Sequence, residues 1–447
     1  MAGIAGIASP DKAELVNRML DKMSHRGWAW RDVIEDRNIT FGAIGLRIQQ
    51  QAHDTLKTDG LARDSAGEGH FAQAQATAAG FELKRDSLGV TPLYYGRTND
   101  GMLCFASEVK GLLEATRDVH EMPPGNCYDG LKMETYARIA VQDPLDESPE
   151  VIAAELRRRL ETAIEKRIGD GRVGAWLSGG LDSSTMVALV RKHVSNFHTF
   201  AAGLPGAPDL EFARAMADFI KSDHHEVTVE PEEILQVLPD VIYHLESFDA
   251  LLVRSSVMNY LVAKRASDFA PAVFSGEGGD ELFAGYDYLK SLEPALLPAE
   301  LIDITNRLHN TALQRVDRCA YAFGTVACVG FLDPDVVDYA LRIPIQYKLR
   351  DGIEKWILRQ AMADALPDAI LNRKKAKFWQ GAGVEDMLAR HAEEKITEVD
   401  FARERGLPDG GRLNTKEELM YYRIFKEHFG EFDDLSWVGR TKGAPIT

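Results

Sequence analysis

Residues 176–184, WLSGGLDSS, join an apolar run to a helical segment through a glycine-containing loop. A loop of this kind offers its backbone amides to an anion, and the dipole of the following helix strengthens the attraction. The spacing is not that of a Walker A loop, because no Gly-Lys-Ser/Thr follows. The stretch therefore predicts a phosphate-binding turn of a different type, with a plain glycine-rich turn as the alternative.

Strands and helices alternate on both sides of this loop. Apolar runs at residues 172–177, 197–204, 224–229 and 271–276 are separated by segments with helical spacing, which begin near Ser183 and Asp209. Alternation of this kind predicts a parallel sheet with helices on both faces. The chain from about Glu281 onward is expected to be mostly helical.

A second glycine-rich motif, residues 274–286 with the sequence FSGEGGDELFAGY, follows the last of these predicted strands. Ligands of open α/β sheets bind at the carboxyl ends of the strands. Carboxylates flanked by glycines suit a crowded phosphate and metal site, because glycine lets the backbone approach closely. A solvated acidic turn is the alternative when this motif is taken alone.

The first part of the chain has a different pattern, typical of a mixed α/β domain. A helical segment at residues 11–25 precedes strand-like runs at 39–48, 69–78, 80–86 and 91–97. The polar stretch 49–69 is expected to be a loop. A turn-rich segment, residues 142–150, marks a junction, and Ser148 and Pro149 suit the N-cap and first position of the next helix. We therefore expect two domains, residues 1–142 and 143–447.

Composition argues against several classes of protein. The 447 residues contain 52 Lys and Arg against 69 Asp and Glu, and a formal charge of −17 argues against nucleic-acid binding. No apolar run reaches the length of a membrane span. The four cysteines lack CxxC spacing, so neither a disulfide scaffold nor a zinc site is indicated. We expect a cytoplasmic protein without nucleic-acid or membrane partners, whose acidic surface is compatible with a homodimer.

Taken together, the two glycine-rich motifs resemble those of enzymes that split ATP between its α and β phosphates, and nearly the whole chain resembles glutamine-dependent asparagine synthetase. Further matches are GLPGAPDL (203–210), HHEV (224–227), DVIYHLESFD (240–249), Arg254, GFLD (330–333), RKKAKFWQGAG (373–383), MAGIAG (1–6), HRG (25–27) and RDSLGVTPLYYG (85–96). The resemblance implies an α/β protein: a degenerate N-terminal α+β domain like that of Ntn hydrolases, then a parallel α/β synthetase domain of the PP-loop ATP pyrophosphatase type with a helical C-terminal part.

The same resemblance implies amide ligation in two steps. A carboxylate attacks the α-phosphorus of ATP, giving an acyl-adenylate and pyrophosphate, and an amine then attacks the acyl carbon. By resemblance, Glu277 would be the general base for the amine, while Lys375 and Arg254 would neutralise charge on the phosphates. A solvated lysine is the alternative for Lys375. Asp182 and Asp280 would ligate Mg²⁺ on the pyrophosphate of ATP. The ATP and pyrophosphate site would comprise Leu177, Ser178, Gly179, Gly180, Asp182, Ser183, Ser184, Gly203, Ser275 and Gly276.

The N-terminal part departs from the family where glutamine would be hydrolysed. The family's nucleophile is an N-terminal cysteine, and Ala2 stands at that position. The family's NGEIYN segment and a later Asp that holds the glutamine amino group also have no counterpart. An engineered replacement would explain Ala2 alone, whereas the three losses together predict an inactive glutaminase domain kept as a structural cap.

The predicted acid pocket also departs from the family. Leu251 and Leu252 stand where the family has threonines before Arg254, and Val326 and Cys328 replace the Glu and Arg of its GVEARVPFLD motif. Aspartate has three charges to satisfy, so the loss of polar groups favours a larger or less polar acid. A repacked helix interface is the alternative explanation.

We therefore expect an ATP-dependent amide ligase that joins an acid other than aspartate to ammonia or another amine, without hydrolysing glutamine. Three alternatives stay open: an ammonia-dependent asparagine synthetase, an intramolecular lactam-forming synthetase, and a non-catalytic homologue that binds a partner or nucleotide. The β-lactam-forming relatives carry Tyr at the position of Glu277, which counts against the second. The charged site residues that the chain retains count against the third.

Overall fold

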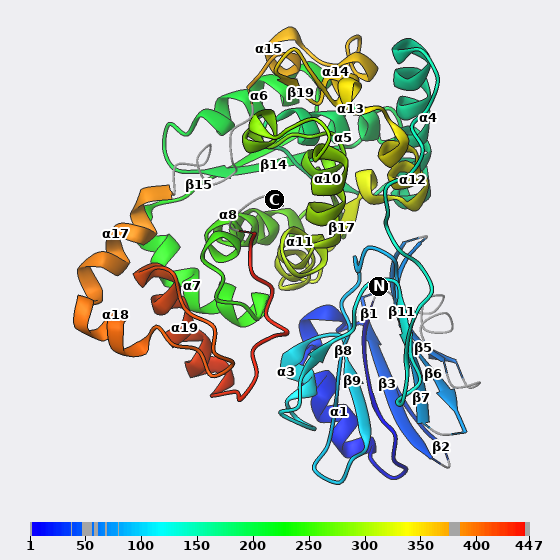
Figure 1. The fold of residues 1–447 in the computed structure, drawn as a ribbon, viewed down its shortest axis with the longest axis vertical. Helices are drawn as coiled ribbons and strands as arrows, with labels where there is room; N and C mark the ends of the chain where they lie inside the picture. Colours follow the sequence, from blue (N-terminus) through cyan, green and yellow to red (C-terminus); the bar gives the residue numbers. More distant parts are fainter. Residues whose placement is uncertain are drawn as a thin grey trace.

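The computed structural model describes residues 2–36, 38–46, 56–57, 61–67, 69–78, 80–374 and 385–442. Figure 1 shows two parts: a β-rich N-terminal part at the bottom, and a larger part above it in which helices surround a sheet. Residues 136–148, which connect them, form neither helix nor strand.

Two antiparallel six-stranded sheets build the N-terminal part. The first contains, in spatial order, β10 (His120–Glu121), β8 (Tyr94–Arg97), β9 (Leu103–Ala106), β1 (Ala2–Ile7), β3 (Ile39–Gly45) and β2 (Trp30–Asp36). The second contains β12 (Met133–Thr135), β11 (Asn126–Tyr128), β7 (Gly80–Arg85), β6 (His70–Thr77), β5 (Leu61–Gly67) and β4 (Leu56–Lys57). Ile4, Phe41 and Phe81 are buried in one apolar cluster that draws on both sheets, and α1 (Ala13–Lys22), η1 (Ser24–Arg26) and α3 (Val109–Leu112) complete this part.

The predicted helix and the four predicted strands of this part are confirmed as α1, β3, β6, β7 and β8. The expected loop at 49–69 is corrected, because its described residues include β4 and the seven-residue β5, which pairs with β6. Asp64 in β5 is buried and contacts Arg26 at 3.1 Å. A polar side chain that faces inward removes the alternation by which a strand is recognised.

Five parallel strands form the central sheet of the larger part, in the order β15 (Asp223–Thr228), β14 (His198–Gly203), β13 (Gly174–Trp176), β16 (Ala272–Ser275) and β17 (Val326–Val329). The chain moves outward from β13 to β15 and then returns to β16 on the other side of β13. A reversal of this kind opens a crevice at the carboxyl ends of the two strands where it occurs. Both glycine-rich motifs follow these two strands, so the topology brings them together.

The larger part also contains many helices, most of which surround this sheet (Figure 1). They are α4 (Pro149–Ile168), α5 (Leu181–Arg191), α6 (Pro208–Ile220), α7 (Pro231–Leu245), α8 (Ala250–Ser267), α9 (Gly279–Leu282), η2 (Asp287–Ser291), α10 (Leu297–Asn306), η3 (Leu308–Asn310), α11 (Ala312–Tyr321), η4 (Gly330–Leu332), α12 (Pro334–Arg342), α13 (Ile345–Lys348), α14 (Trp356–Ala361), α15 (Asp368–Leu371), α17 (Glu385–Lys395), α18 (Glu398–Glu404) and α19 (Lys416–Phe429). The helices α17, α18 and α19 lie away from the sheet beside α7 (Figure 1). Ser148 caps α4 as predicted, its hydroxyl accepting from the amide of Val151. None of the described helices is both long and apolar enough to cross a membrane.

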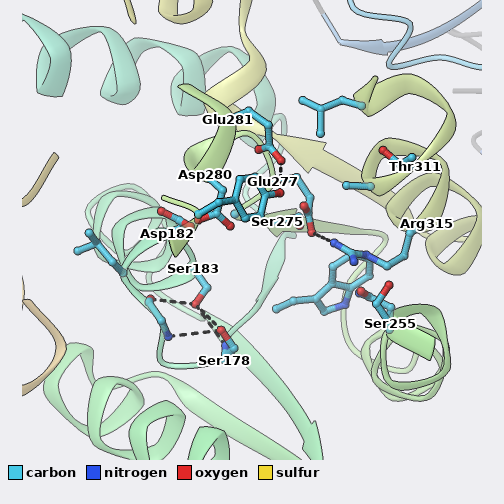
Figure 2. Close-up of a pocket in the computed structure, with 18 of the residues that line it drawn as sticks. Ser178, Asp182, Ser183, Ser255, Ser275, Glu277, Asp280, Glu281, Thr311 and Arg315 are labelled. Carbon is cyan, nitrogen blue, oxygen red and sulfur yellow. Dashed lines mark hydrogen bonds and ion pairs between the residues drawn. The ribbon is translucent and has the colours of Figure 1, made fainter. Parts of the chain in front are cut away.

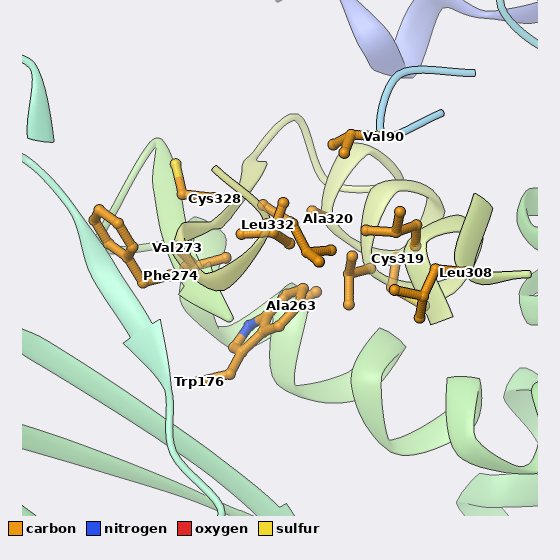
Figure 3. Packing of buried hydrophobic residues seen from close by; sticks show 14 of the residues in the cluster. Val90, Trp176, Ala263, Val273, Phe274, Leu308, Cys319, Ala320, Cys328 and Leu332 are labelled. Carbon is orange, nitrogen blue, oxygen red and sulfur yellow. The ribbon is translucent and has the colours of Figure 1, made fainter. Parts of the chain in front are cut away.

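The expectation of a mostly helical chain after Glu281 is confirmed among the described residues, with exceptions in β17 and in the hairpin of β18 (Leu349–Arg350) and β19 (Ile353–Glu354). All four residues of β17 are buried. A short strand buried on both faces has no alternation to distinguish it from a helix. Figure 3 shows Cys328 of β17 near Val273 and Phe274 of β16 in the apolar core.

Charged side chains of the two parts of the molecule form buried ion pairs with one another. Arg26 of η1 is fully buried, and its guanidinium contacts Asp64 at 3.1 Å, Glu108 at 3.0 Å and Asp317 of α11 at 2.8 Å. Its planar face also lies over the ring of Tyr321. Because the buried Arg26 guanidinium has lost its water, it depends on Asp317 of the larger part as well as on Asp64 and Glu108 of its own part.

Glu246, which follows α7, extends this network. Its carboxylate accepts hydrogen bonds from the amides of Val109 and Lys110 at 3.1 and 2.7 Å, at the start of α3. It also pairs with the Lys110 ammonium at 2.8 Å and the Arg318 guanidinium at 3.2 Å. One buried carboxylate of the larger part thus holds a helix end and a lysine of the N-terminal part.

Replacement of Glu246 by alanine is expected to lower the free energy of unfolding of the full chain by about 3–5 kcal/mol, because it leaves two buried cations without this partner. Urea denaturation measures the effect. Glu14→Ala is the matched control, since the Glu14 side chain is 93% exposed in its pair with Arg18. Equal, small effects of the two replacements would contradict a structural role for the network.

Lys348 at the end of α13 is buried, and burial lowers the pKa of its ammonium to about 7. Between about pH 7 and the unfolded-chain pKa of about 10.4, the unfolded chain binds a proton at Lys348 that the native protein lacks. The free energy of unfolding therefore rises with pH in this window, by about 1.4 kcal/mol per pH unit. We expect Lys348→Met to lose this slope and to exceed the unaltered protein in stability at pH 7, with the gap closing toward pH 10. Urea titrations at several pH values measure the difference. The exposed lysine Lys264 provides the control replacement, and an identical pH slope in Lys348→Met would contradict the assignment.

Candidate active site

The first glycine-rich loop connects β13 to α5, as predicted. Gly180 is the N-cap of α5, and the helix begins at Leu181. The Ser183 hydroxyl accepts from the Ser178 amide at 3.3 Å and donates to the Gly180 carbonyl at 3.2 Å, and Figure 2 shows the two serines facing each other. These contacts fold the loop over the amino end of an eleven-residue helix, where amides and the helix dipole favour an anion.

The second loop connects β16 to α9 and lies against the first. A Cβ atom at Gly276 would lie 2.8 Å from the Ser183 amide nitrogen, and one at Gly279 would lie 2.5 Å from a carboxylate oxygen of Asp182. At Gly276 a side chain would meet the backbone of the first loop, so glycine is required there, and at Gly279 a side chain would displace the Asp182 carboxylate. The contact between the two loops brings Asp182, at the start of α5, together with Asp280 of α9.

Lys355 lies between these two carboxylates. Its ammonium is 2.6 Å from Asp280 and also contacts Asp182. The lysine follows β19 in a left-handed backbone conformation, and its amide donates to the carbonyl of Phe283 at 3.1 Å. The side chain is buried, so the two acidic groups and the lysine form one compact charged centre.

The donor set suits Mg²⁺ bound together with phosphates. Mg²⁺ in nucleotide sites takes one or two carboxylates from the protein and its remaining ligands from phosphates and water. Asp182 and Asp280 provide two carboxylates from adjacent loops, and no cluster of three or more potential ligands is found among the described residues. The residues fit a metal that arrives with its nucleotide rather than one held by the protein alone.

Glu277 lies between the first glycine-rich loop and α11. Its carboxylate pairs with Arg315 of α11 (Figure 2). The neighbouring Glu281 is buried and accepts a hydrogen bond from the Tyr286 hydroxyl at 2.5 Å. Burial, reinforced by the charge of Asp280, raises the pKa of Glu281 to about 7. The acidic groups of this motif therefore lie in three different environments.

A cavity of about 530 Å³ contains these groups and extends toward α8, α10 and α11. On α8 its lining residues, Leu251, Ser255, Asn259 and Val262, recur every three or four positions and so share one helix face. Leu252 lies beside them, and α10, η3 and α11 provide the opposite side. The cavity thus has a charged end at the two loops and a more apolar end between these helices.

Most residues predicted for the site line this one cavity. They are Leu177, Ser178, Gly180, Asp182, Ser183, Leu251, Leu252, Ser275, Gly276, Glu277 and Asp280. Gly179 lies in the first loop, Ser184 in the first turn of α5 and Gly203 at the end of β14, and none of the three is among the described residues that line the cavity. Ala2 is the first residue of β1 in the N-terminal part. Lys375 lies outside the described residues, and the chemical roles of the whole set stay predictions.

Arg254, Val326 and Cys328 lie elsewhere. Arg254 is on α8 next to the cavity face, and its guanidinium pairs with Glu417 of α19, with Nε at 3.0 Å. Val326 and Cys328 point into the core from the buried strand β17, where Cys328 is 3% exposed. Within the described chain none of the three lines the cavity. The two residues of the strand contact the core in this structure, and their role in the choice of acid stays a prediction.

Sequence reasoning missed Lys355 and Arg315. Neither belongs to a glycine-rich motif, and each reaches the site from a segment far from both loops, so no local pattern distinguishes them from surface cations. Arg373 had a signal, because it begins one of the quoted matches. It donates to the Ser178 carbonyl at 2.9 Å and to Asp209 at 2.5 Å. Three of the sequence stretches that resemble the family, those with Ser178, Asp209 and Arg373, thus meet at the first glycine-rich loop.

Comparison with known proteins finds two family models and several relatives that are similar to this chain. A family model for asparagine synthase matches residues 155–302 and 297–442, and one for a glutamine amidotransferase domain matches residues 55–128. Asparagine synthetase [glutamine-hydrolyzing] 2 of Lotus japonicus is 35% identical over 375 residues, which are 78% of this chain and 64% of that protein. Asparagine synthetase B [glutamine-hydrolyzing] of Escherichia coli (strain K12) is 32% identical over 395 residues, 82% of this chain and 70% of that protein.

The chain therefore spans slightly under two thirds of the length of the Lotus relative that it matches. Among solved structures, NMN synthetase from Francisella tularensis has a TM-score of 0.30 at 14% identity, over 64% of this chain and 98% of that one.

Proposed function

The chain belongs to the asparagine synthase family, and from this membership we propose that it adenylates a carboxylic acid with ATP and transfers the acyl group to ammonia or another amine without hydrolysing glutamine. One observation carries the proposal. A phosphate loop at a helix N-terminus, the carboxylates of Asp182 and Asp280, and the carboxylate of Glu277 share one cavity at the point where the strand order reverses.

In the first step the acid must become an electrophile. Its carboxylate attacks the α-phosphorus of ATP, which joins the acyl oxygen to AMP and releases pyrophosphate. The amides of the loop before α5, with Ser178 and Ser183, would hold the pyrophosphate. Asp182 and Asp280 would hold Mg²⁺, which when bound neutralises charge on the phosphates. Lys355 adds a buried positive charge at the same place.

In the second step an amine attacks the acyl carbon and must lose a proton as the amide forms. Glu277 is the acidic residue that lines the cavity between the phosphate loop and α11. A carboxylate in this position accepts the proton as the carbon–oxygen bond to AMP breaks. The products are then the amide, AMP and pyrophosphate.

Independence from glutamine is supported by Ala2 and by two of the four cysteines. Ala2 occupies the first position of β1, where the family has its nucleophile. Burial raises the pKa of the Cys104 thiol and of the Cys319 thiol to about 12. A thiol of that pKa is not a nucleophile near neutral pH. The buried charges that join the two parts of the molecule suit the role of a structural cap for the N-terminal part.

The choice of acid is supported by the α8 side of the cavity. Leu251 and Leu252 both line it, in place of the polar residues of the asparagine synthetases. A second carboxylate or an α-ammonium packed against these two leucines would lose hydration that the leucines cannot replace. We therefore propose an acid whose body is largely apolar, rather than aspartate.

Carboxylate-dependent ATP–pyrophosphate exchange tests the proposal. The full chain, Mg²⁺, ATP and labelled pyrophosphate are combined with a panel of acids that includes aspartate, alkyl acids and aryl acids, without glutamine. We expect exchange with an acid that has an apolar body and none above background with aspartate. Aspartate as the best acid would contradict the proposed pocket, and silence with every acid from a protein that still binds ATP would contradict the proposed ligase.

A further inference from the structure

Arg315 occupies a distinctive place in the cavity. It comes from α11, its side chain is only 12% exposed, and its guanidinium meets the Glu277 carboxylate. Its Nε atom is buried and has no hydrogen-bond partner among the described residues. Figure 2 shows Arg315 extending from α11 toward Glu277, with Ser255 of α8 nearby. A guanidinium has five N–H donors in a planar fork, so one that lines a cavity can bind a second planar anion when its side chain turns.

Other cations that line the cavity are already held by carboxylates, among them Lys442, held by Glu300 and Asp303 of α10, and two at the nucleotide end. Lys355 is held by Asp182 and Asp280, and Arg373 is held by Asp209 and the Ser178 carbonyl. Arg315 instead comes from α11 and lies near Ser255 of α8 (Figure 2), whose cavity face also carries the two leucines. It is therefore placed between the group that would take the amine's proton and the surface that would bind the body of the acid.

Adenylation also requires a cation where the carboxylate of the acid binds. A carboxylate that enters the apolar end of the cavity loses water, and an unpaired carboxylate there is costly. Arg254 is turned toward Glu417 of α19, so it does not meet this need in the structure. Arg315 can pair with the carboxylate of the acid once its guanidinium gives up the Glu277 carboxylate.

We propose that Arg315 binds the carboxylate of the acid substrate and gives up its contact with Glu277 when it does so. This inference rests on the proposed ligase function. One oxygen of the bound carboxylate attacks the α-phosphorus of ATP while Arg315 holds the other. After pyrophosphate has left, that second oxygen is the acyl oxygen, and Arg315 stabilises the negative charge that it gains when the amine attacks. The released Glu277 carboxylate takes the proton from the amine. A single exchange of ion-pair partners thus anchors the acid and frees the base.

The proposed switch of ion-pair partners predicts that two replacements shift the KM for the acid in opposite directions. This KM is measured by ATP–pyrophosphate exchange with the acid that the unaltered protein accepts. Arg315→Gln is expected to raise this KM by about 30-fold or more, with the KM for ATP within about threefold of its original value. Glu277→Gln removes the competing carboxylate and is expected to lower the KM for the acid. Arg315→Lys keeps the charge but loses the planar fork, so it is expected to give an intermediate KM.

Arg265→Gln is the matched control, because Arg265 forms an exposed pair with Asp268 at the far end of α8. Thermal melting of each variant shows whether it is folded, and Arg315→Lys carries the test if Arg315→Gln does not fold. An unchanged KM for the acid in both Arg315 variants would overturn the inference while leaving the ligase intact. A Glu277→Gln variant whose KM for the acid rises as in Arg315→Gln would also overturn it, since the pair would then act as one unit. No exchange in the unaltered protein would overturn the proposed function itself.

Discussion

Asp182→Asn and Asp280→Asn are each expected to reduce carboxylate-dependent ATP–pyrophosphate exchange by about 10³-fold, because each removes one of the two charges that meet at the phosphate loop. The amide keeps the size of the side chain but neither pairs with the Lys355 ammonium as an anion nor ligates a hard divalent cation well. The measurement is the initial rate of exchange at saturating acid, ATP and Mg²⁺.

Asp170→Asn is the control for this pair. Asp170 forms a solvent-exposed pair with Arg172 just before β13, so its replacement changes the same charge outside the cavity. We expect its exchange rate to match that of the unaltered protein. Exchange in Asp182→Asn or Asp280→Asn that stays within about tenfold of the original rate would contradict a transition-state role for these carboxylates.

Glu277→Gln is expected to separate the two half-reactions. Amide formation should fall by about 10²–10⁴-fold, since the amine loses the group that accepts its proton. Pyrophosphate exchange should continue, because adenylation involves no amine and the Asp182–Asp280–Lys355 centre is untouched. Exchange and amide production are measured in parallel on the same preparation.

Glu226→Gln serves as the control for Glu277→Gln, because Glu226 pairs with Arg214 at the surface of β15. A Glu277→Gln protein that still makes amide at the original rate would remove Glu277 from the role of general base. Loss of both half-reactions together would instead place Glu277 in substrate binding.

The central sheet and its two loops could be predicted from the sequence because glycine and serine occur there for local reasons. The contact between the loops needs Gly276, and a short apolar strand precedes each loop. Strand–helix alternation then gives a parallel sheet, and its carboxyl edge locates the cavity. These features depend on residues that are close together in the chain.

Features that depend on distant residues could not be predicted in the same way. Lys355 and Arg315 enter the cavity from α-helical and hairpin segments whose own sequences carry no phosphate or carboxylate signal. The strand β5 was hidden because Asp64 faces inward to meet Arg26. The direction of side chains could not be predicted either. The motif placed Cys328 in the pocket, whereas in the structure it lies in the core.

The source of nitrogen tests the account most directly. The full chain is incubated with ATP, Mg²⁺ and the acid that supports exchange, once with ¹⁵N-ammonium and unlabelled glutamine and once with unlabelled ammonium and glutamine labelled in its amide. Mass spectrometry of the product then locates the label. We expect ¹⁵N in the new amide only from ammonium, together with AMP and pyrophosphate in equal amounts to the amide. Label that arrives from glutamine, or ADP in place of AMP, would contradict the account.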